Sequence, residues 1–90
     1  MEFEWHEPKR LRTLAERGLD FADADLLFNG ECLVEQARTE RGEARWIAVG
    51  SMDGMFVAVV YTIRGSTVRI ILMRSARDGE RRRYQALLGN

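Results

Sequence analysis

The sequence predicts an α+β domain in which two N-terminal helices and a C-terminal helix pack on a four-stranded antiparallel sheet. Apolar residues repeat at helical spacing up to residue 28, and after residue 30 the period becomes that of strands. The later apolar runs are separated by turns too short for a crossover connection, which makes the sheet antiparallel. With 90 residues, 46% of them apolar, and a single proline, residues 1–90 are expected to form one domain.

The N-terminal part predicts two short helices. "EFEW" at 2–5 alternates acidic and aromatic residues, so it is either a short strand or an arm that places its aromatic side chains in the core. A helix over 8–17 starts with proline and stops before a glycine. Asp20 is a suitable N-cap for a second helix over 20–28.

Four strands are expected after these helices, at 31–37, 44–52, 55–62 and 67–73. The third is apolar on both faces, so it should be central and covered on both sides. The two N-terminal helices would cover one face, and the C-terminal helix or a partner's helix would cover the other. Ser75 is the expected cap of the last helix.

Charge is divided unevenly although the net charge is zero. Residues 1–63 carry 7 Lys/Arg and 12 Asp/Glu, whereas residues 64–90 carry 7 Arg and 2 Asp/Glu. This asymmetry indicates either an anion-binding surface or attraction between the two halves.

Other features exclude some classes of site. Cys32 is the only cysteine and His6 the only histidine, so no disulfide and no multi-cysteine or multi-histidine metal site is expected. We expect no metal and no cofactor. The chain shows neither an apolar segment near eighteen residues nor a signal-peptide pattern, so we expect a cytoplasmic protein without membrane contact.

The arginines of the predicted strands are candidate functional residues. Alternation places Arg45 on one face with Ile47. It places Arg69 on one face with Met73, and Arg74 on the opposite face unless a bulge re-aims it.

Two interpretations of these arginines remain open. The first is an ion pair within one strand, between Glu43 and Arg45. The second is a site in which arginines from adjacent strands grip a phosphate. RNA cleavage at such a site would use the substrate's 2′-OH, with Glu43 as base and Arg45, Arg69 and Arg74 as cations. No general acid stands out. We expect further RNA contacts from the basic residues Lys9, Arg64, Arg77 and Arg81.

Ordered matches along nearly the whole chain resemble the BrnT family of toxins. In the first half they are "FEW" at 3–5 followed by Lys9, "GLDF" at 18–21, Ala24, Phe28, "EAR" at 43–45 and Gly50. In the second half they are "VVYTIRG" at 59–65, "VRII" at 68–71, Arg74, Ala76, Glu80 and Tyr84.

The resemblance implies a RelE-like fold and metal-independent RNA cleavage that arrests growth. It also implies an antitoxin of the BrnA type, with a ribbon-helix-helix part that binds DNA. Operator DNA would be contacted only through the toxin–antitoxin complex, which represses its own operon.

This chain departs from the family pattern at several positions. His6 stands where most members have aspartate, and it is expected in the N-terminal arm or as a substitute acid. Arg17 and Thr39 replace family histidines, and Leu72 replaces a serine. An alternative function is therefore a catalytically degenerate toxin that binds the antitoxin and helps repression. A third is a plain nucleic-acid binder that uses the basic segment 74–83.

Overall fold

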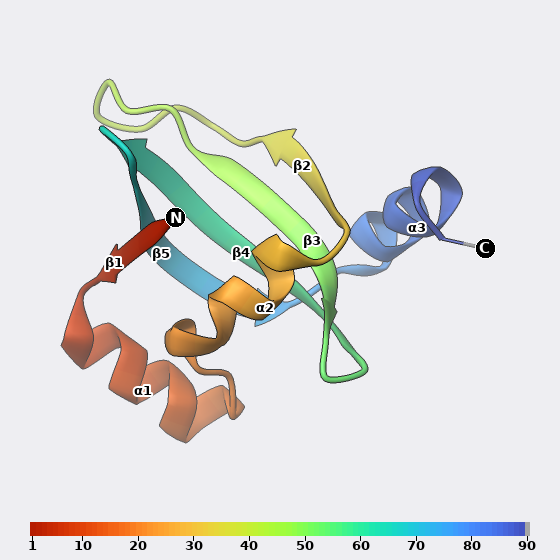
Figure 1. The fold of residues 1–90 in the computed structure, drawn as a ribbon, viewed down its shortest axis with the longest axis horizontal. Helices are drawn as coiled ribbons and strands as arrows, with labels where there is room; N and C mark the ends of the chain where they lie inside the picture. The colour runs from red at the N-terminus through yellow and green to blue at the C-terminus, as the bar shows by residue number, and fades with distance from the viewer. Residues whose placement is uncertain (90) are drawn as a thin grey trace.

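The computed structural model, shown in Figure 1, describes residues 1–89. The strands are β1 (Glu2–Trp5), β2 (Cys32–Gln36), β3 (Trp46–Met52), β4 (Met55–Arg64) and β5 (Thr67–Ser75). The helices are α1 (Glu7–Arg17), the short 3-10 helix η1 (Phe21–Asp23), α2 (Ala24–Asn29) and α3 (Asp78–Leu87). The α+β class, the predicted helices and the four predicted strands are confirmed. Among residues 1–89, no helix is both long enough and apolar enough to span a membrane.

The sheet has five strands in the order β1-β5-β4-β3-β2 and is mixed. Strands β2 to β5 form the predicted antiparallel meander, with β4 at the centre. The prediction of a purely antiparallel four-stranded sheet is wrong, because β1 adds to the edge of β5 in parallel register. Short turns indicate pairing only between consecutive strands, whereas each residue of β1 pairs with a residue of β5 that lies 65 positions further along the chain.

The core lies between the sheet and α2. Val57, Val59 and Tyr61 of β4 are buried on this side, and Leu27 of α2 packs against them. The aromatic side chains of β1 pack against the core from the edge of the sheet, as when Phe3 lies 5.6 Å from Phe28, centroid to centroid. The arm at 2–5 therefore combines both alternatives predicted for it, because it is a strand and its aromatic side chains reach the core.

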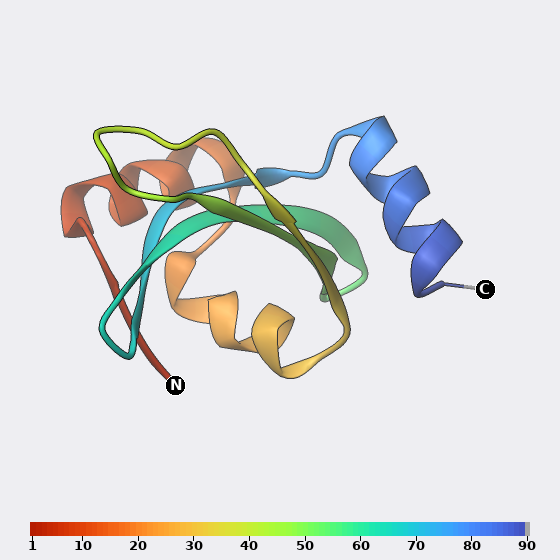
Figure 2. The same cartoon turned by 90° about the horizontal axis from the view of Figure 1, so that it is seen from above.

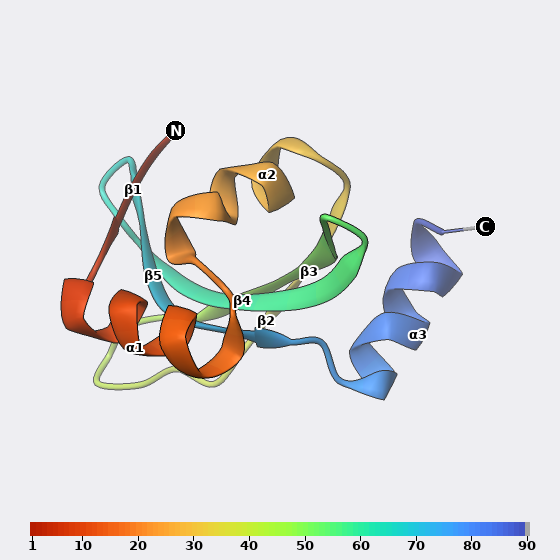
Figure 3. The ribbon, with the colours of Figure 1, turned by 90° about the horizontal axis from the view of Figure 1, so that it is seen from below.

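Helix α1 lies on the opposite side of the sheet from α2 (Figures 2 and 3). The expectation that both N-terminal helices cover one face is therefore wrong. Arg17 at the end of α1 donates from Nη1 to the carbonyl oxygen of Met73 in β5, at 3.0 Å. Thr13 is the buried side chain of this helix, whereas Leu11 and Leu14 are half-exposed. The polar side of α1 faces the sheet, so the spacing of its apolar residues did not predict which side of the helix would be buried.

A β-bulge in β5 changes which side chains share a face. Val60 pairs with Leu72 and Tyr61 with Ile70, so Ile71 is an extra residue opposite β4. The side chain of Met73 points into the core, whereas Arg69 does not. The prediction that Arg69 and Met73 share a face is therefore wrong, and the bulge is the physical reason.

The bulge also brings two arginines to the same face. Arg69 pairs with Thr62 and Arg74 with Ala58, and these two partners lie four residues apart on β4. Residues separated by an even number point to the same side of a strand. Arg69 and Arg74 therefore both lie on the face away from α2.

Helix α3 begins later than predicted. Its N-cap is Arg77 rather than Ser75, which is the last residue of β5. The carboxylate of Glu80 accepts a hydrogen bond from the backbone N–H of Arg77 at 2.8 Å, which satisfies a free donor at the helix start. The ring of Tyr84 lies 5.3 Å from that of Phe56, so α3 packs at the far end of β4 from the β4–β5 turn.

Candidate active site

A cationic pocket of about 220 Å³ opens on the sheet face away from α2, where Thr62 and Arg69 point. Five of the predicted site residues meet there: Lys9, Glu43, Arg45, Arg64 and Arg69. Lys9 comes from α1, Arg64 from β4 and Arg69 from β5, and the other two lie in the segment just before β3. The pocket also holds His6, for which the sequence allowed the role of a substitute acid, and Thr62, which was not predicted as a site residue.

Strand register positions Arg69 in the pocket, and one buried hydroxyl positions Arg45. Thr62 pairs directly with Arg69 across β4 and β5. The hydroxyl of Thr62, which is 2% exposed, donates to the carbonyl oxygen of Ala44 at 2.8 Å. This bond fixes the backbone immediately before Arg45. Nothing in the alternation of β4 marked Thr62 as different from any other strand threonine.

Glu43 is held by Arg64 and not by Arg45. Arg64 donates from Nε and Nη2 to the two carboxylate oxygens of Glu43, at 3.0 and 3.4 Å. The strand-level pair predicted between Glu43 and Arg45 is therefore wrong. The hydrogen bond from Arg64 lowers the pKa of Glu43, and the positive charges of Arg64, Arg45 and Arg69 lower it further. Glu43 is an ionised carboxylate in the free protein at neutral pH.

A tight turn places Glu43 beside a second carboxylate. Arg41 and Gly42 both have positive φ, at 52° and 76°, as the central residues of a type I′ turn require. Glu40 and Glu43 exchange two backbone hydrogen bonds across this turn, at 3.0 and 2.9 Å. The turn therefore presents both carboxylates to the arginines of the pocket.

Arg45 is the least satisfied guanidinium of the pocket. Its nearest carboxylate is Glu40, with 3.6 Å between Nη1 and Oε2, which is longer than a good hydrogen bond. Its Nε is buried and has no hydrogen-bond partner among the residues that the structure describes. A buried donor without a partner costs free energy. The Arg45 side chain as a whole is 29% exposed and has no close carboxylate in the described part of the chain, so it is open to an anionic ligand.

Lys9 adds positive charge that no carboxylate neutralises within residues 1–89. Burial lowers the pKa of Lys9, and the nearby charges of Arg12, Arg45 and Arg17 lower it further. A phosphate near this ammonium would relieve the repulsion between like charges.

The parallel strand β1 supplies the carboxylate that meets Arg69. Arg69 donates from Nη1 to Oε2 of Glu4 at 2.7 Å. This contact uses one of the five N–H donors of a guanidinium. Arg69 therefore keeps donors for a ligand in the pocket, where it forms part of the wall.

The structure does not bring Arg74 into the pocket. Its guanidinium forms two hydrogen bonds with the carboxylate of Glu80, at 2.8 and 2.9 Å, in a largely buried pair. Hydrogen bonding to Glu80 raises the pKa of Arg74, and the same pairing lowers the pKa of Glu80. This pair links the end of β5 to the first turn of α3, which is a structural position.

Arg77 and Arg81 also lie away from the pocket, at α3. Arg77 is the N-cap residue of that helix, and the guanidinium of Arg81 lies 5.4 Å from the ring centroid of Phe56. Figure 1 shows α3 at the opposite end of the molecule from α1, whose first turns carry the pocket residue Lys9. The predicted RNA-binding residues therefore fall into two separate groups.

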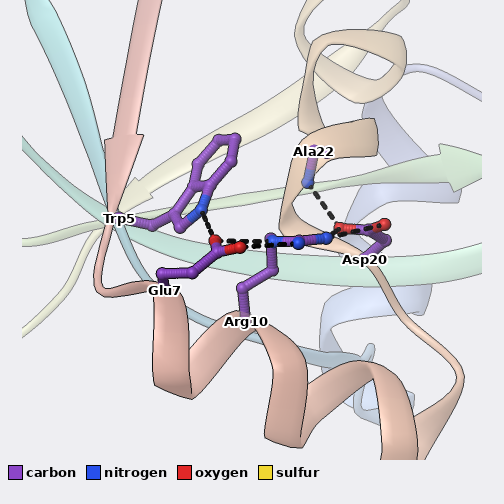
Figure 4. Close-up of polar contacts among 5 residues, drawn as sticks. All are labelled: Trp5, Glu7, Arg10, Asp20 and Ala22. Atoms are coloured by element: carbon purple, nitrogen blue, oxygen red, sulfur yellow. Dashed lines mark hydrogen bonds and ion pairs between the residues drawn. The ribbon is translucent and has the colours of Figure 1, made fainter.

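A network of polar side chains fixes the start of α1 (Figure 4). The indole Nε1 of Trp5 donates to Glu7 at 2.8 Å. Arg10 donates to both oxygens of Glu7 and also reaches Asp20, whose carboxylate accepts from the backbone N–H of Ala22 at 2.9 Å. The network ties β1, α1 and η1 together, so it holds the first turn of α1 against the pocket.

The pocket groups several cations around one carboxylate. This arrangement is typical of sites that bind a phosphodiester and stabilise the charge that develops during its cleavage. Within residues 1–89, no three His, Cys, Asp or Glu side chains gather where they could hold a metal ion. A family model described as "Ribonuclease toxin, BrnT, of type II toxin-antitoxin system" matches residues 5–80. The chain belongs to this family, which confirms the resemblance found in the sequence.

The family match contains every residue named in the pocket and ends before Arg81. Membership of a type II toxin–antitoxin family implies an antitoxin partner. A comparison with curated proteins found no significant match.

Proposed function

We propose that this protein is a metal-independent endoribonuclease toxin that cleaves RNA in the cytoplasm and arrests growth. Its antitoxin is of the BrnA type and silences it by binding. The complex contacts operator DNA through the ribbon-helix-helix part of the antitoxin. Family membership supports the ribonuclease and toxin–antitoxin parts of this proposal.

The observation that carries the proposal is that the pocket contains positive charge without a matching negative charge. Arg45 has a buried Nε without a partner, and Lys9 is a partly buried ammonium surrounded by cations. Both line the same hollow as Arg69. An RNA phosphate would supply the missing acceptors and the missing negative charge.

The chemistry follows from the roles of the individual side chains. Glu43 accepts the proton of the 2′-OH as this oxygen attacks phosphorus. Arg45 and Arg69 donate to the non-bridging oxygens and stabilise the charge that grows on them. Arg64 exchanges its pair with Glu43 for a phosphate oxygen, so that the carboxylate becomes free to act as a base.

Arg74, Arg77 and Arg81 have different places in this proposal. We assign Arg74 to anchoring α3, because both Glu80 oxygens occupy its guanidinium. Arg77 and Arg81 are candidates for contacts with RNA that continues beyond the pocket. Such contacts would add affinity without taking part in the reaction.

The experiment is incubation of the purified free protein with a short single-stranded RNA in excess EDTA. We expect products that end in a 2′,3′-cyclic phosphate and a 5′-hydroxyl, as attack by the 2′-OH requires. Arg69→Ala should lower the rate by about 100-fold or more, because it removes a donor to the transition-state charge. Arg83→Ala is the matched control, since Arg83 pairs with Glu35 on the exposed surface.

Intact RNA after incubation with excess folded protein would contradict the enzyme proposal. Together with a stable complex between protein and antitoxin, that result would favour the degenerate toxin that serves only in repression. A wild-type rate for Arg69→Ala would contradict the placement of the reaction in this pocket.

A further inference from the structure

We propose that His6 is the general acid of the reaction, donating a proton to the 5′-oxygen that leaves phosphorus. This inference rests on the proposed ribonuclease function and adds the one role that the arginines and Glu43 cannot fill. Arginine holds its proton too tightly to give it up at neutral pH. Glu43 is ionised and carries no proton to give.

The position of His6 makes its imidazole available to a ligand. His6 is the N-cap residue of α1, with φ −84° and ψ 110°. A side chain at this position commonly accepts a hydrogen bond from the first turn of the helix, but that of His6 forms no such bond. It instead lines the pocket that contains Glu43 and the cations.

Both sequence neighbours of His6 are fixed by the polar network of Figure 4. Trp5 donates to Glu7, and Arg10 clamps the same carboxylate with hydrogen bonds of 2.8 and 2.7 Å. The backbone of residue 6 is therefore held on both sides. A proton donor needs this kind of fixed placement, because transfer takes place over hydrogen-bond distance.

The charged groups that line the pocket with His6 come from four elements. They are Lys9 of α1, Glu43 and Arg45 from the segment before β3, Arg64 of β4 and Arg69 of β5. The three arginines are unsuited to the acid role because a guanidinium does not give up its proton at neutral pH. Lys9 is the rival donor, because burial and the nearby charges of Arg12, Arg45 and Arg17 lower its pKa and make its proton easier to give.

The bonds and protons of this step balance with the groups that line the pocket. The 2′-oxygen forms a bond to phosphorus as its proton passes to the Glu43 carboxylate. The bond from phosphorus to the 5′-oxygen breaks, and this oxygen takes its proton from the His6 imidazolium. The products are a 2′,3′-cyclic phosphate and a 5′-hydroxyl, and both side chains return to their starting states by exchange of protons with water.

The test compares two RNA substrates that differ in one atom. One has the normal 5′-oxygen at the scissile linkage, and the other has sulfur in its place. A thiolate leaves without protonation, so the sulfur substrate does not need a general acid. We expect His6→Ala to slow cleavage of the oxygen substrate by about 100-fold or more, and to slow cleavage of the sulfur substrate less than about threefold.

Controls separate this role from the others in the pocket. Arg69→Ala should slow cleavage of both substrates, because the growing phosphoryl charge is present with either leaving group. His6→Asn serves as the second variant, since asparagine is also a good N-cap and preserves the start of α1 if alanine does not. Lys9→Ala tests the rival donor by the same comparison.

Three results would overturn the inference. His6→Ala and His6→Asn with wild-type rates would show that the imidazole has no part in the reaction. Equal losses on both substrates would make the role of His6 structural. A loss confined to the oxygen substrate in Lys9→Ala, and absent in the His6 variants, would assign the acid to Lys9. Failure of the wild-type protein to cleave either substrate would instead refute the proposed function itself.

Discussion

At the scale of single residues, the ion pair with Arg64 controls the pKa of Glu43, the candidate base. The pKa of Glu43 is lowered chiefly by its hydrogen bond from Arg64. The carboxylate is thus available at lower pH than an isolated glutamate would be, but as a weaker base.

Replacing Arg64 should therefore change the pH dependence of the reaction. In Arg64→Gln the pKa of Glu43 rises toward its ordinary value, so a higher pH is needed to ionise the base. We expect the acidic limb of the pH profile of kcat/KM, which reports the free enzyme, to move to higher pH. Arg83→Gln is the control, since Arg83 pairs with Glu35 outside the pocket. An unmoved limb would mean that Glu43 is not the base.

Glu7 offers a test of the network that holds the start of α1. Hydrogen bonds from Arg10 and Trp5 lower the pKa of Glu7 to about 2. A carboxyl group whose folded-state pKa is lowered stabilises the protein fully above its unfolded-state pKa, and this contribution is lost as pH falls through the folded-state value. The window therefore runs from pH 4.5 down to about pH 2.

In Glu7→Gln this contribution is missing at every pH. We expect the variant to unfold more easily than the wild type at pH 7 and the difference to shrink between pH 4.5 and about pH 2. Chemical denaturation followed by circular dichroism at several pH values measures it. A constant difference across that range would contradict the pairing of Glu7 with Arg10.

The sequence was informative about some residues of the site and silent about others. Glu43, Arg45 and Arg69 stood out because charges in or beside apolar strands need a partner. Glu4 and Thr62 could not be selected in that way. The role of Glu4 depends on the parallel pairing of β1 with β5, and that of Thr62 on its contact with Ala44.

At the scale of elements, local patterns predicted the helices and strands but not how they are turned or joined. The bulge at Ile71 leaves no mark in the alternation of β5, and it decides which arginines share a face. The side of the sheet that α1 takes depends on contacts such as that of Arg17 with Met73, far apart in the chain. Periodicity is a local signal and does not record such contacts.

The attachment of α3 provides a prediction at this scale. Arg74 and Glu80 form a largely buried pair, with side chains 15% and 6% exposed. Arg74→Ala leaves the Glu80 carboxylate without its main partner, which should cost about 2–3 kcal/mol of unfolding free energy. Denaturant unfolding measures this cost.

The same variant separates a structural role of Arg74 from the catalytic role first predicted for it. Because Arg74 lies outside the pocket, folded Arg74→Ala protein should cleave RNA at a rate near that of the wild type. Arg83→Ala, which breaks an exposed pair, should leave the free energy of unfolding close to that of the wild type. If the Arg74→Ala protein is stable but cleaves RNA more slowly by orders of magnitude, Arg74 has a catalytic role after all.

At the scale of the whole molecule, ion pairs between the two halves explain much of the uneven charge. Basic residues of the last third pair with acidic residues nearer the N-terminus, as Arg69 does with Glu4, and Arg83 with Glu35. The halves therefore attract each other in the fold. The pocket keeps cations that this pairing does not satisfy, Arg45 and Lys9 among them.

The central claim is that guanidinium groups from separate segments converge in one pocket to hold an RNA phosphodiester. Its most direct measurement is the affinity of the protein for a short RNA whose scissile 2′-OH is replaced by hydrogen, so that binding occurs without cleavage. We expect Arg45→Ala and Arg69→Ala each to weaken binding by about tenfold or more. The double variant Arg77→Ala/Arg81→Ala on α3 should weaken it by less than about threefold, as contacts outside the pocket would. Wild-type affinity in both pocket variants, with binding abolished in the α3 double variant, would contradict the account.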